Sequence, residues 1–247
     1  MASNEYYEGR LMESNKALHN EIKLRLNFDS ISVDGSTRTK GDTFGIKGNK
    51  STPISIKNAS GQNTQVHITS INKLREELGM PRNVFDIFNK FLGTNDASVF
   101  DSWRQNLSLD RYELGHKRIK CYNIANSEQA IKWINSVNVT GLLPKLLIQS
   151  IDAEHPVEFM IWISKKKGGY QIVDVNKLVN YISKECTWRF TSRGTVIECV
   201  DKENKKILWL QMKGNREPNG YNHAPQFHIA SVWPKEFVIH EDSNIRF

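Results

Sequence analysis

Apolar residues near the start of the chain recur at helical spacing. Between about residues 4 and 26 they fall on one face of a helix, while charged residues fill the other face. The apolar positions are Tyr7, Leu11, Leu18 and Ile22. The following segment, residues 30 to 34, alternates as a strand does and ends at an Asp-Gly turn dipeptide. The pattern therefore predicts a helix that leads into strands.

The rest of the chain switches between segments whose apolar residues have the spacing of a strand and segments whose apolar residues have the spacing of a helix. Strands are predicted at 43–46, 53–59 and 66–68, and a helix follows Thr69, whose side chain suits a helix N-cap. Further helices are predicted at 83–92, 127–137 and 174–182, and β-rich segments at 156–163, 194–200, 206–212 and 224–229. This order predicts one mixed α/β domain over residues 1–247, with a central mixed sheet flanked by helices and a β-rich C-terminal part.

Composition narrows the class of protein. Of the 247 residues, 38% are apolar and 25% are charged, which is ordinary for a globular protein that can bury a core. The formal charge of +7 favours an anionic partner. The three cysteines are far apart and lack metal-ligand spacing, and no signal peptide or membrane span is apparent. We therefore expect a cytoplasmic protein with reduced thiols and no membrane partner.

The candidate chemistry lies on the second and third predicted strands. Asp42 begins one strand and Lys57 lies on the next, where strand alternation places Ser55 and Lys57 on one face. The same alternation places Ile54 and Ile56 on the opposite, buried face. Phosphodiester hydrolysis needs a metal ion to activate water and to neutralise charge, with a base or electrophile beside it. Mg²⁺ is held through one or two carboxylates. Asp42 and Lys57 therefore suit a site in which Asp42 binds Mg²⁺ and Lys57 lies at the attacking water.

Asp42, twelve intervening residues and then Ser55-Ile56-Lys57 resemble the PD-(D/E)XK signature of type II restriction endonucleases. The resemblance covers about the first eighty residues and implies a restriction-endonuclease-like core. It also implies that Asp42 binds the metal, that Lys57 is the catalytic lysine, and that Glu21, on the preceding helix, is an outer or second-metal ligand. Residues 1–80 would then be the catalytic core, and the strand-rich residues 150–247 would contribute DNA recognition.

The chain departs from the signature at two positions. Gly41 replaces the proline, and Ser55 replaces the second acid. Some restriction enzymes with a non-acidic residue at this position recruit a carboxylate from the following helix, where Glu76 and Glu77 lie in this chain, and others rely on a backbone carbonyl and water. Ser55 would then support the geometry of the site, and another carboxylate would complete the metal ligands.

Polar residues of the kinds that contact DNA gather in three segments. The loop after Lys57 and a long predicted β-hairpin near the C-terminus are two of them, and a basic pair around Phe190 is the third. The candidate DNA-binding residues are Asn58, Ser60, Gln62, Asn63, Gln65, Arg189, Arg193, Lys213, Arg216, Asn222, His223 and Gln226.

Together these features predict a sequence-specific, Mg²⁺-dependent endonuclease of restriction type that cleaves double-stranded DNA. Two alternatives stay open. One is a nucleic-acid-binding protein without catalysis, in which Ser55 marks a degenerate site, and the other is a repair or phage nuclease on the same fold. The oligomeric state, monomer or homodimer, also stays open.

Overall fold

The computed structural model divides the chain into two compact units. Unit 1 comprises residues 1–64, 144–181 and 230–247, and unit 2 comprises residues 65–143 and 182–229. Whether both belong to one nuclease domain stays a prediction. The structure describes residues 16–33, 43–59, 63–68, 71–92, 98, 101–102, 111–115, 118–122, 127–149, 156–164, 169–191, 196–212, 225–230 and 237–243.

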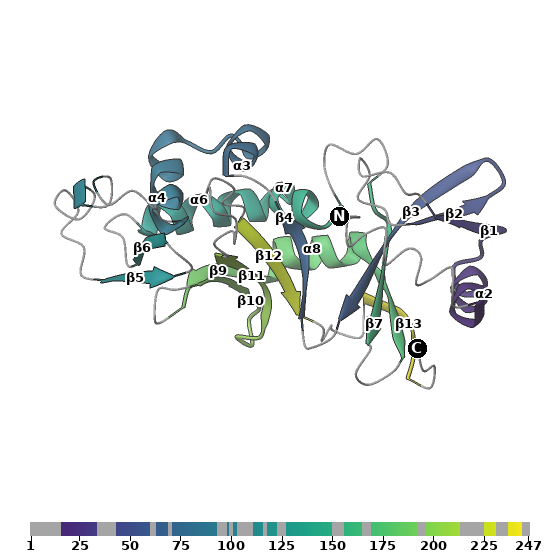
Figure 1. Cartoon of the computed structure of the whole chain (residues 1–247). Helices are drawn as coiled ribbons and strands as arrows, with labels where there is room; N and C mark the ends of the chain where they lie inside the picture. Colours follow the sequence, from purple (N-terminus) through teal and green to yellow (C-terminus); the bar gives the residue numbers. More distant parts are fainter. Residues whose placement is uncertain are drawn as a thin grey trace. The chain divides into compact units, whose positions relative to one another are not determined.

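Unit 1 is built on a six-stranded mixed sheet. Its strand order is β1-β2-β3-β7-β8-β13, and β3 and β7 are parallel while the other neighbours are antiparallel (Figure 1). The sheet confirms the predicted mixed α/β class. The strands are β1 (Ser30–Val33), β2 (Thr43–Lys47), β3 (Lys50–Ala59), β7 (Phe159–Ser164), β8 (Tyr170–Asp174) and β13 (Val238–Asp242).

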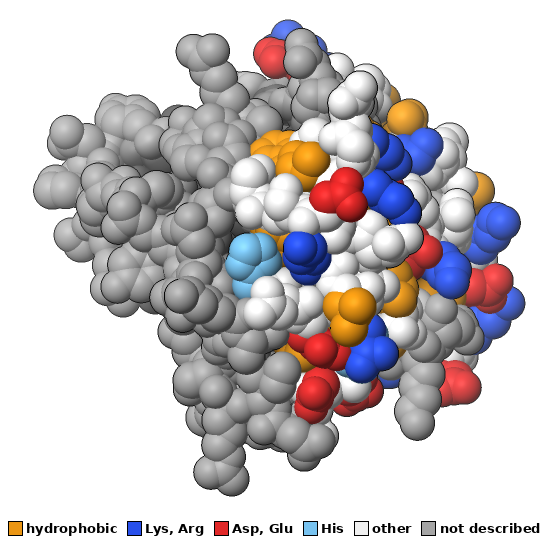
Figure 2. Space-filling view, turned by 90° about the vertical axis from the view of Figure 1, so that its right-hand side faces the viewer, with side chains coloured by type: hydrophobic (Ala, Val, Ile, Leu, Met, Phe, Trp, Pro, Cys, Tyr) orange, Lys and Arg blue, Asp and Glu red, His pale blue; other side chains and the backbone are white. Residues whose placement is uncertain are grey.

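Helix α2 (Lys16–Arg25) covers one face of this sheet. Ile22 on α2 packs with Ile54 and Ile56 of β3 in a core cluster that also takes in residues of β7 and β8. The helix ends because Asn27 adopts a left-handed conformation, with φ of 57°, and the Phe28 amide then donates to the Lys23 carbonyl. The side of unit 1 with α2 and the β2–β3 hairpin carries Lys and Arg among Asp and Glu (Figure 2).

Helix α8 (Val175–Glu185) follows β8 directly. The Asp174 carboxylate accepts a hydrogen bond from the Lys177 amide at 3.0 Å, which is the arrangement of a helix N-cap. A short helix α7 (Leu142–Pro144) and a π-helix η1 (Lys145–Gln149) precede β7. The predicted helix at 174–182 is therefore confirmed, with the aspartate as its cap.

The described residues of unit 2 form a five-stranded sheet in the order β4-β12-β11-β10-β9 and the helices α3, α4 and α6. Its strands are β4 (Asn63–Ile68), β9 (Thr187–Phe190), β10 (Ile197–Val200), β11 (Lys206–Met212) and β12 (Pro225–Ala230), with a separate pair β5 (Arg111–Gly115) and β6 (Arg118–Tyr122). Its helices are α3 (Ile71–Leu78), α4 (Arg82–Leu92) and α6 (Ser127–Val139). These three helices lie where the apolar periodicity predicts them.

Asn138 of α6 ties together several segments of unit 2. Its side chain is fully buried and donates to the carbonyls of Ile182 and Cys186 while it accepts from the Trp188 indole N–H at 3.0 Å. Because a buried amide must find partners for all its polar atoms, this network holds the start of β9 against α6. Within the described ranges, no helix combines the length and the apolar character that crossing a membrane requires.

Candidate active site

The predicted pair of strands exists and forms a hairpin. β2 and β3 are antiparallel, and Thr43 pairs with Ile54 while Lys47 pairs with Lys50. Thr43 is fully buried, and its hydroxyl donates to the Ser32 carbonyl of β1. Asp42 lies outside the described residues, and it is the residue directly before Thr43 in the sequence. The point where the chain enters β2 is thus fixed on both sides, by β1 and by β3.

Ser55 and Lys57 lie in the middle of the sheet. They alternate with Ile54 and Ile56 along β3, so they project from the face opposite to the α2 cluster. In the parallel ladder with β7 they pair with Met160 and Trp162. Ser55 is fully buried, and Lys57 is only 6% exposed.

The burial of Lys57 was not expected from alternation alone. The sequence indicated one buried face of β3, and the structure buries both faces at these positions. β3 is an internal strand with a parallel neighbour, and strands in such a position are usually covered on both faces. Lysine is rarely buried to this extent, because removing an ammonium from water costs several kcal/mol unless it is compensated.

Backbone contacts attach β7 and α8 to the strand that carries Lys57. The Glu158 amide donates to the Pro53 carbonyl, and the Val175 amide donates to the Glu158 carbonyl, both at 3.1 Å. The buried Gln149 side chain donates to the Asn176 side chain at 2.7 Å. These contacts hold the start of β7 and the start of α8 together beside β3.

Glu21 is not brought to the Lys57 face. It lies next to Ile22 on α2, on the side of the sheet that carries Ile54 and Ile56. Its carboxylate contacts Arg25 at 2.7 Å and lies 3.7 Å from Nε2 of His240. Within unit 1 the structure therefore gives Glu21 partners that differ from the predicted metal site.

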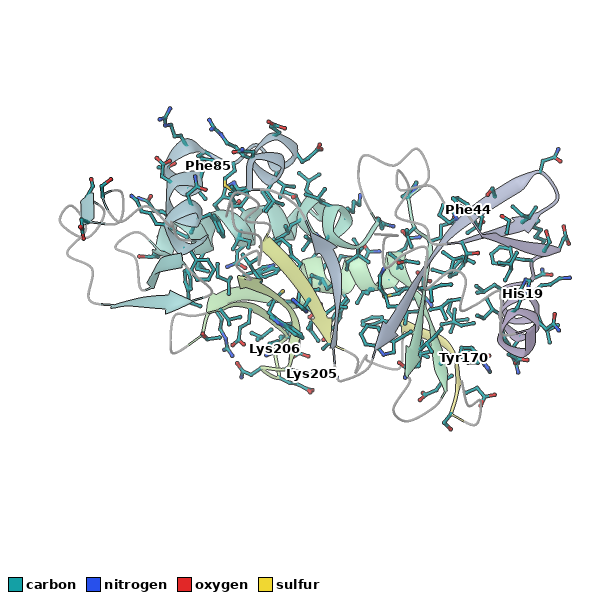
Figure 3. All side chains as sticks on the ribbon, in the orientation of Figure 1. His19, Phe44, Phe85, Tyr170, Lys205 and Lys206 are labelled. Carbon is teal, nitrogen blue, oxygen red and sulfur yellow. The ribbon has the colours of Figure 1, made fainter. Side chains whose placement is uncertain are left out.

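Tyr170 of β8 lies in the same group as Glu21 and His240 (Figure 3 labels Tyr170). It is 2% exposed, and its hydroxyl has no hydrogen-bond partner among the described residues. Burial, together with the negative charges of Glu21 and Asp242, raises the pKa of Tyr170 to about 12, against a smaller opposing effect of Arg25. Tyr170 is therefore a neutral phenol at ordinary pH.

Glu76 and Glu77 are exposed residues of α3 in unit 2. Their predicted recruitment as metal ligands stays a prediction, as does the metal role of Glu21. Among the described residues, to which Asp42 does not belong, there is no group of three or more His, Cys, Asp or Glu side chains placed to hold a metal ion.

The residues that are described at the site fit Mg²⁺ only in part. Ser55 offers a neutral hydroxyl oxygen, which is a ligand type that Mg²⁺ accepts. Lys57 offers a positively charged ammonium group. A carboxylate is still required, and Asp42 is the one that the sequence places next to Thr43.

The predicted loop after β3 is shorter than expected. Asn58 belongs to β3, and Asn63 and Gln65 belong to β4. Ser60 and Gln62 lie outside the described residues. The DNA contacts predicted for these five residues stay predictions.

The predicted C-terminal hairpin is confirmed in its strands. β11 and β12 are antiparallel, with Met212 opposite Pro225, and Gln226 lies on β12 opposite Gln211. The remaining residues proposed there for DNA contact lie outside the described ranges, as does Arg193: they are Lys213, Arg216, Asn222 and His223.

Arg189 lies on β9 in unit 2 and has protein partners. Its guanidinium donates to the Glu198 carboxylate at 3.2 Å and to the Asn204 side chain at 2.8 Å, and its side chain is 46% exposed. The exposed part keeps N–H groups at the surface while the two partners fix the direction of the side chain. A role in DNA contact stays a prediction.

Comparison with known proteins gives a similarity in backbone arrangement and none in sequence families. No family model matches the chain, and no curated protein matches it. The chain is similar in backbone arrangement to restriction endonuclease MspI, solved as a crystal structure in complex with its cognate DNA, at 13% sequence identity and a TM-score of 0.49. The similarity covers 86% of this chain and 77% of that chain.

Proposed function

We propose that this chain is a Mg²⁺-dependent endonuclease that cleaves double-stranded DNA at specific sequences, as type II restriction enzymes do. The observation that carries the proposal is the burial of Lys57 beside Ser55, on the strand paired with the one that follows Asp42. Lysine is rarely buried to this extent, so a lysine in the middle of a mixed sheet beside a buried serine is a candidate for function.

Each residue has a role in the proposal. Asp42 would hold Mg²⁺ through its carboxylate, and the Ser55 hydroxyl would support the ligand geometry. Bound Mg²⁺ supplies charge neutralisation at the phosphate and a more acidic water. The Lys57 ammonium would orient the attacking water and counter the charge that develops on the phosphate. Burial strengthens this interaction, because a charge acts more strongly where water is excluded.

The absence of an acid at position 55 leaves a second candidate. A non-catalytic DNA-binding protein would keep the same fold and would have lost one metal ligand at Ser55. A repair or phage nuclease with structure specificity would use the same residues on a different substrate.

Incubation of the protein with plasmid DNA and MgCl₂ separates these functions. The proposal expects discrete fragments that need the divalent ion. Smeared products or cutting at branched DNA would support the repair nuclease. Intact DNA together with tight, salt-sensitive binding would support the non-catalytic protein and would overturn the proposal.

A further inference from the structure

Phe44 of β2 is a half-buried aromatic residue beside the candidate site in unit 1 (Figure 3 labels it). We propose that its ring packs against a nucleoside next to the scissile phosphate and so positions the DNA strand for cleavage. The inference deepens the proposed function and rests on it, because it assigns a further contact with the same substrate.

Phe44 lies on the face of the sheet that carries Ser55. The next residue, Gly45, faces the other side, because a Cβ atom there would overlap the ring of Phe28, which belongs to the same core cluster as Ile54. Successive side chains of a strand point to opposite faces of the sheet. Phe44 therefore projects away from the core cluster, as Ser55 does.

Phe44 is also close to the candidate site along that face. It pairs with Pro53, which is two residues before Ser55, so Phe44 and Ser55 are diagonal neighbours about 7–8 Å apart. Nucleotides of one DNA strand follow each other at about 3.4 Å along the helix axis. A phosphate held at Ser55 and Lys57 would therefore have one of its two adjoining nucleosides within reach of the ring.

The residues around Phe44 on this face have short side chains. Its partners in the two ladders are Ser32 of β1 and Pro53 of β3. Ser32 is exposed, and so are Ser30 and Ser51, which lie one row further along the hairpin on the same face. Part of the aromatic ring is therefore open to solvent among small polar neighbours, where a ligand can contact it.

An aromatic ring in this position suits a nucleoside. Phenylalanine offers a flat apolar surface that stacks on a base or packs on a sugar, and such contacts tolerate any base sequence. β2 is hydrogen-bonded to a strand on each side, so little backbone freedom is lost when the ring binds. The contact would fix the direction in which the DNA strand leaves the scissile phosphate, beside the charge-based contact proposed for Lys57.

The test compares variants on matched DNA duplexes. Phe44→Ala removes the ring, Phe44→Tyr keeps it, and Phe85→Ala removes a half-buried ring of α4 in unit 2 as the control. Phe44→Leu, which keeps apolar volume without a flat ring, replaces Phe44→Ala if that variant does not fold. We would measure kcat/KM with Mg²⁺ on a duplex with the cleavage sequence. Two further duplexes each carry a propyl spacer in place of one nucleoside beside the scissile phosphate.

Phe44→Ala should lower kcat/KM about 10- to 100-fold on the intact duplex, as expected for the loss of one aromatic contact with a nucleoside. On one of the two spacer duplexes it should lower kcat/KM by less than about threefold, because the nucleoside that the ring contacts is already absent. Phe44→Tyr should keep most of the activity, and Phe85→Ala should match the parent chain on every duplex.

Thermal unfolding and sedimentation without DNA check the folding and the oligomeric state of each variant. Equal losses from Phe44→Ala on all three duplexes, or a similar loss from Phe85→Ala, would overturn the nucleoside contact. A changed oligomeric state in Phe44→Ala would assign the ring to an interface between copies of the chain and would overturn it too. In these cases cleavage by the parent chain leaves the proposed function standing. A parent chain that cleaves no DNA would overturn both.

Discussion

Replacement of Tyr170 by phenylalanine should stabilise the protein at neutral pH, which is unusual for a core substitution. The hydroxyl of Tyr170 is buried and has no hydrogen-bond partner among the described residues. A buried hydroxyl without a partner costs about 1–3 kcal/mol relative to water. Phenylalanine keeps the ring and its contact with His240, whose ring centroid is 5.6 Å away, and removes only the oxygen. We expect Tyr170→Phe to raise the free energy of unfolding by about 1 kcal/mol at pH 8.

The increase in unfolding free energy from Tyr170→Phe should become larger at alkaline pH. The pKa of Tyr170 is about 12 in the folded protein and about 10 in the unfolded chain. A raised pKa of a phenol means that folding favours the protonated form. The contribution of Tyr170 protonation to the free energy of unfolding is therefore complete below pH 10 and is lost as the pH rises toward 12. With these two values the parent chain loses about 1 kcal/mol through Tyr170 at pH 11, and Tyr170→Phe loses none of it.

Urea denaturation followed by tryptophan fluorescence at pH 8, 10 and 11 measures the difference between the two proteins. The difference should increase from about 1 to about 2 kcal/mol between pH 8 and pH 11, as the sum of the two effects above. Glu21→Gln should reduce the alkaline loss, because the Glu21 carboxylate contributes to the raised pKa. A variant that is less stable than the parent at pH 8, or a difference that does not change with pH, would refute the reasoning.

Two further predictions concern packing. A Cβ atom at Gly45 would overlap the ring of Phe28, so Gly45→Ala should lower the unfolding free energy by about 1–3 kcal/mol, and Phe28→Leu in the same chain should relieve part of that loss. Additive losses in thermal unfolding of the double variant would contradict this contact. Asn138→Ala should cost about 3 kcal/mol, because it leaves buried partners such as the Trp188 indole unpaired, whereas Asn83→Ala, at an exposed site, should change stability by less than about 0.5 kcal/mol. Equal effects at the two asparagines would show that the buried network contributes nothing.

Local signals were sufficient for the hairpin that carries the candidate site. The polar turn around Gly48 and the alternation through Ile54 and Ile56 are short-range features, and the structure has β2 and β3 where they predict strands. The helices of unit 2 follow for the same reason. α4 and α6 have apolar faces at the predicted positions, and Gly79 ends α3 with φ of 61°.

Several short strands were not predicted. β8 pairs with β13, which lies more than sixty residues later, and β9 is a four-residue strand recognised by its pairing with β10. Short segments of this kind have too few residues for a regular spacing of apolar side chains to be apparent. Their formation depends on hydrogen bonds to a neighbour that the local sequence does not identify.

The sequence also could not predict which residues surround the candidate site residues. Alternation separates Ser55 and Lys57 from Ile54, but it does not say whether another layer covers the polar face. Similarly, the helical pattern around Ile22 indicates a buried stripe without saying which face of the sheet it covers. For that reason the sequence could not predict that Glu21 lies on the face opposite to Lys57.

The central claim is that Asp42 and Lys57 form the catalytic pair of a DNA-cleaving site. The most direct test measures Mg²⁺-dependent plasmid cleavage and DNA binding in Asp42→Ala and Lys57→Ala, with Asp86→Ala and Lys132→Ala in unit 2 as matched controls and Ser55→Ala as a milder variant. The account predicts that each of the first two substitutions abolishes cleavage and leaves DNA binding largely intact, while the controls cleave like the parent chain. Full cleavage by either Asp42→Ala or Lys57→Ala would contradict it.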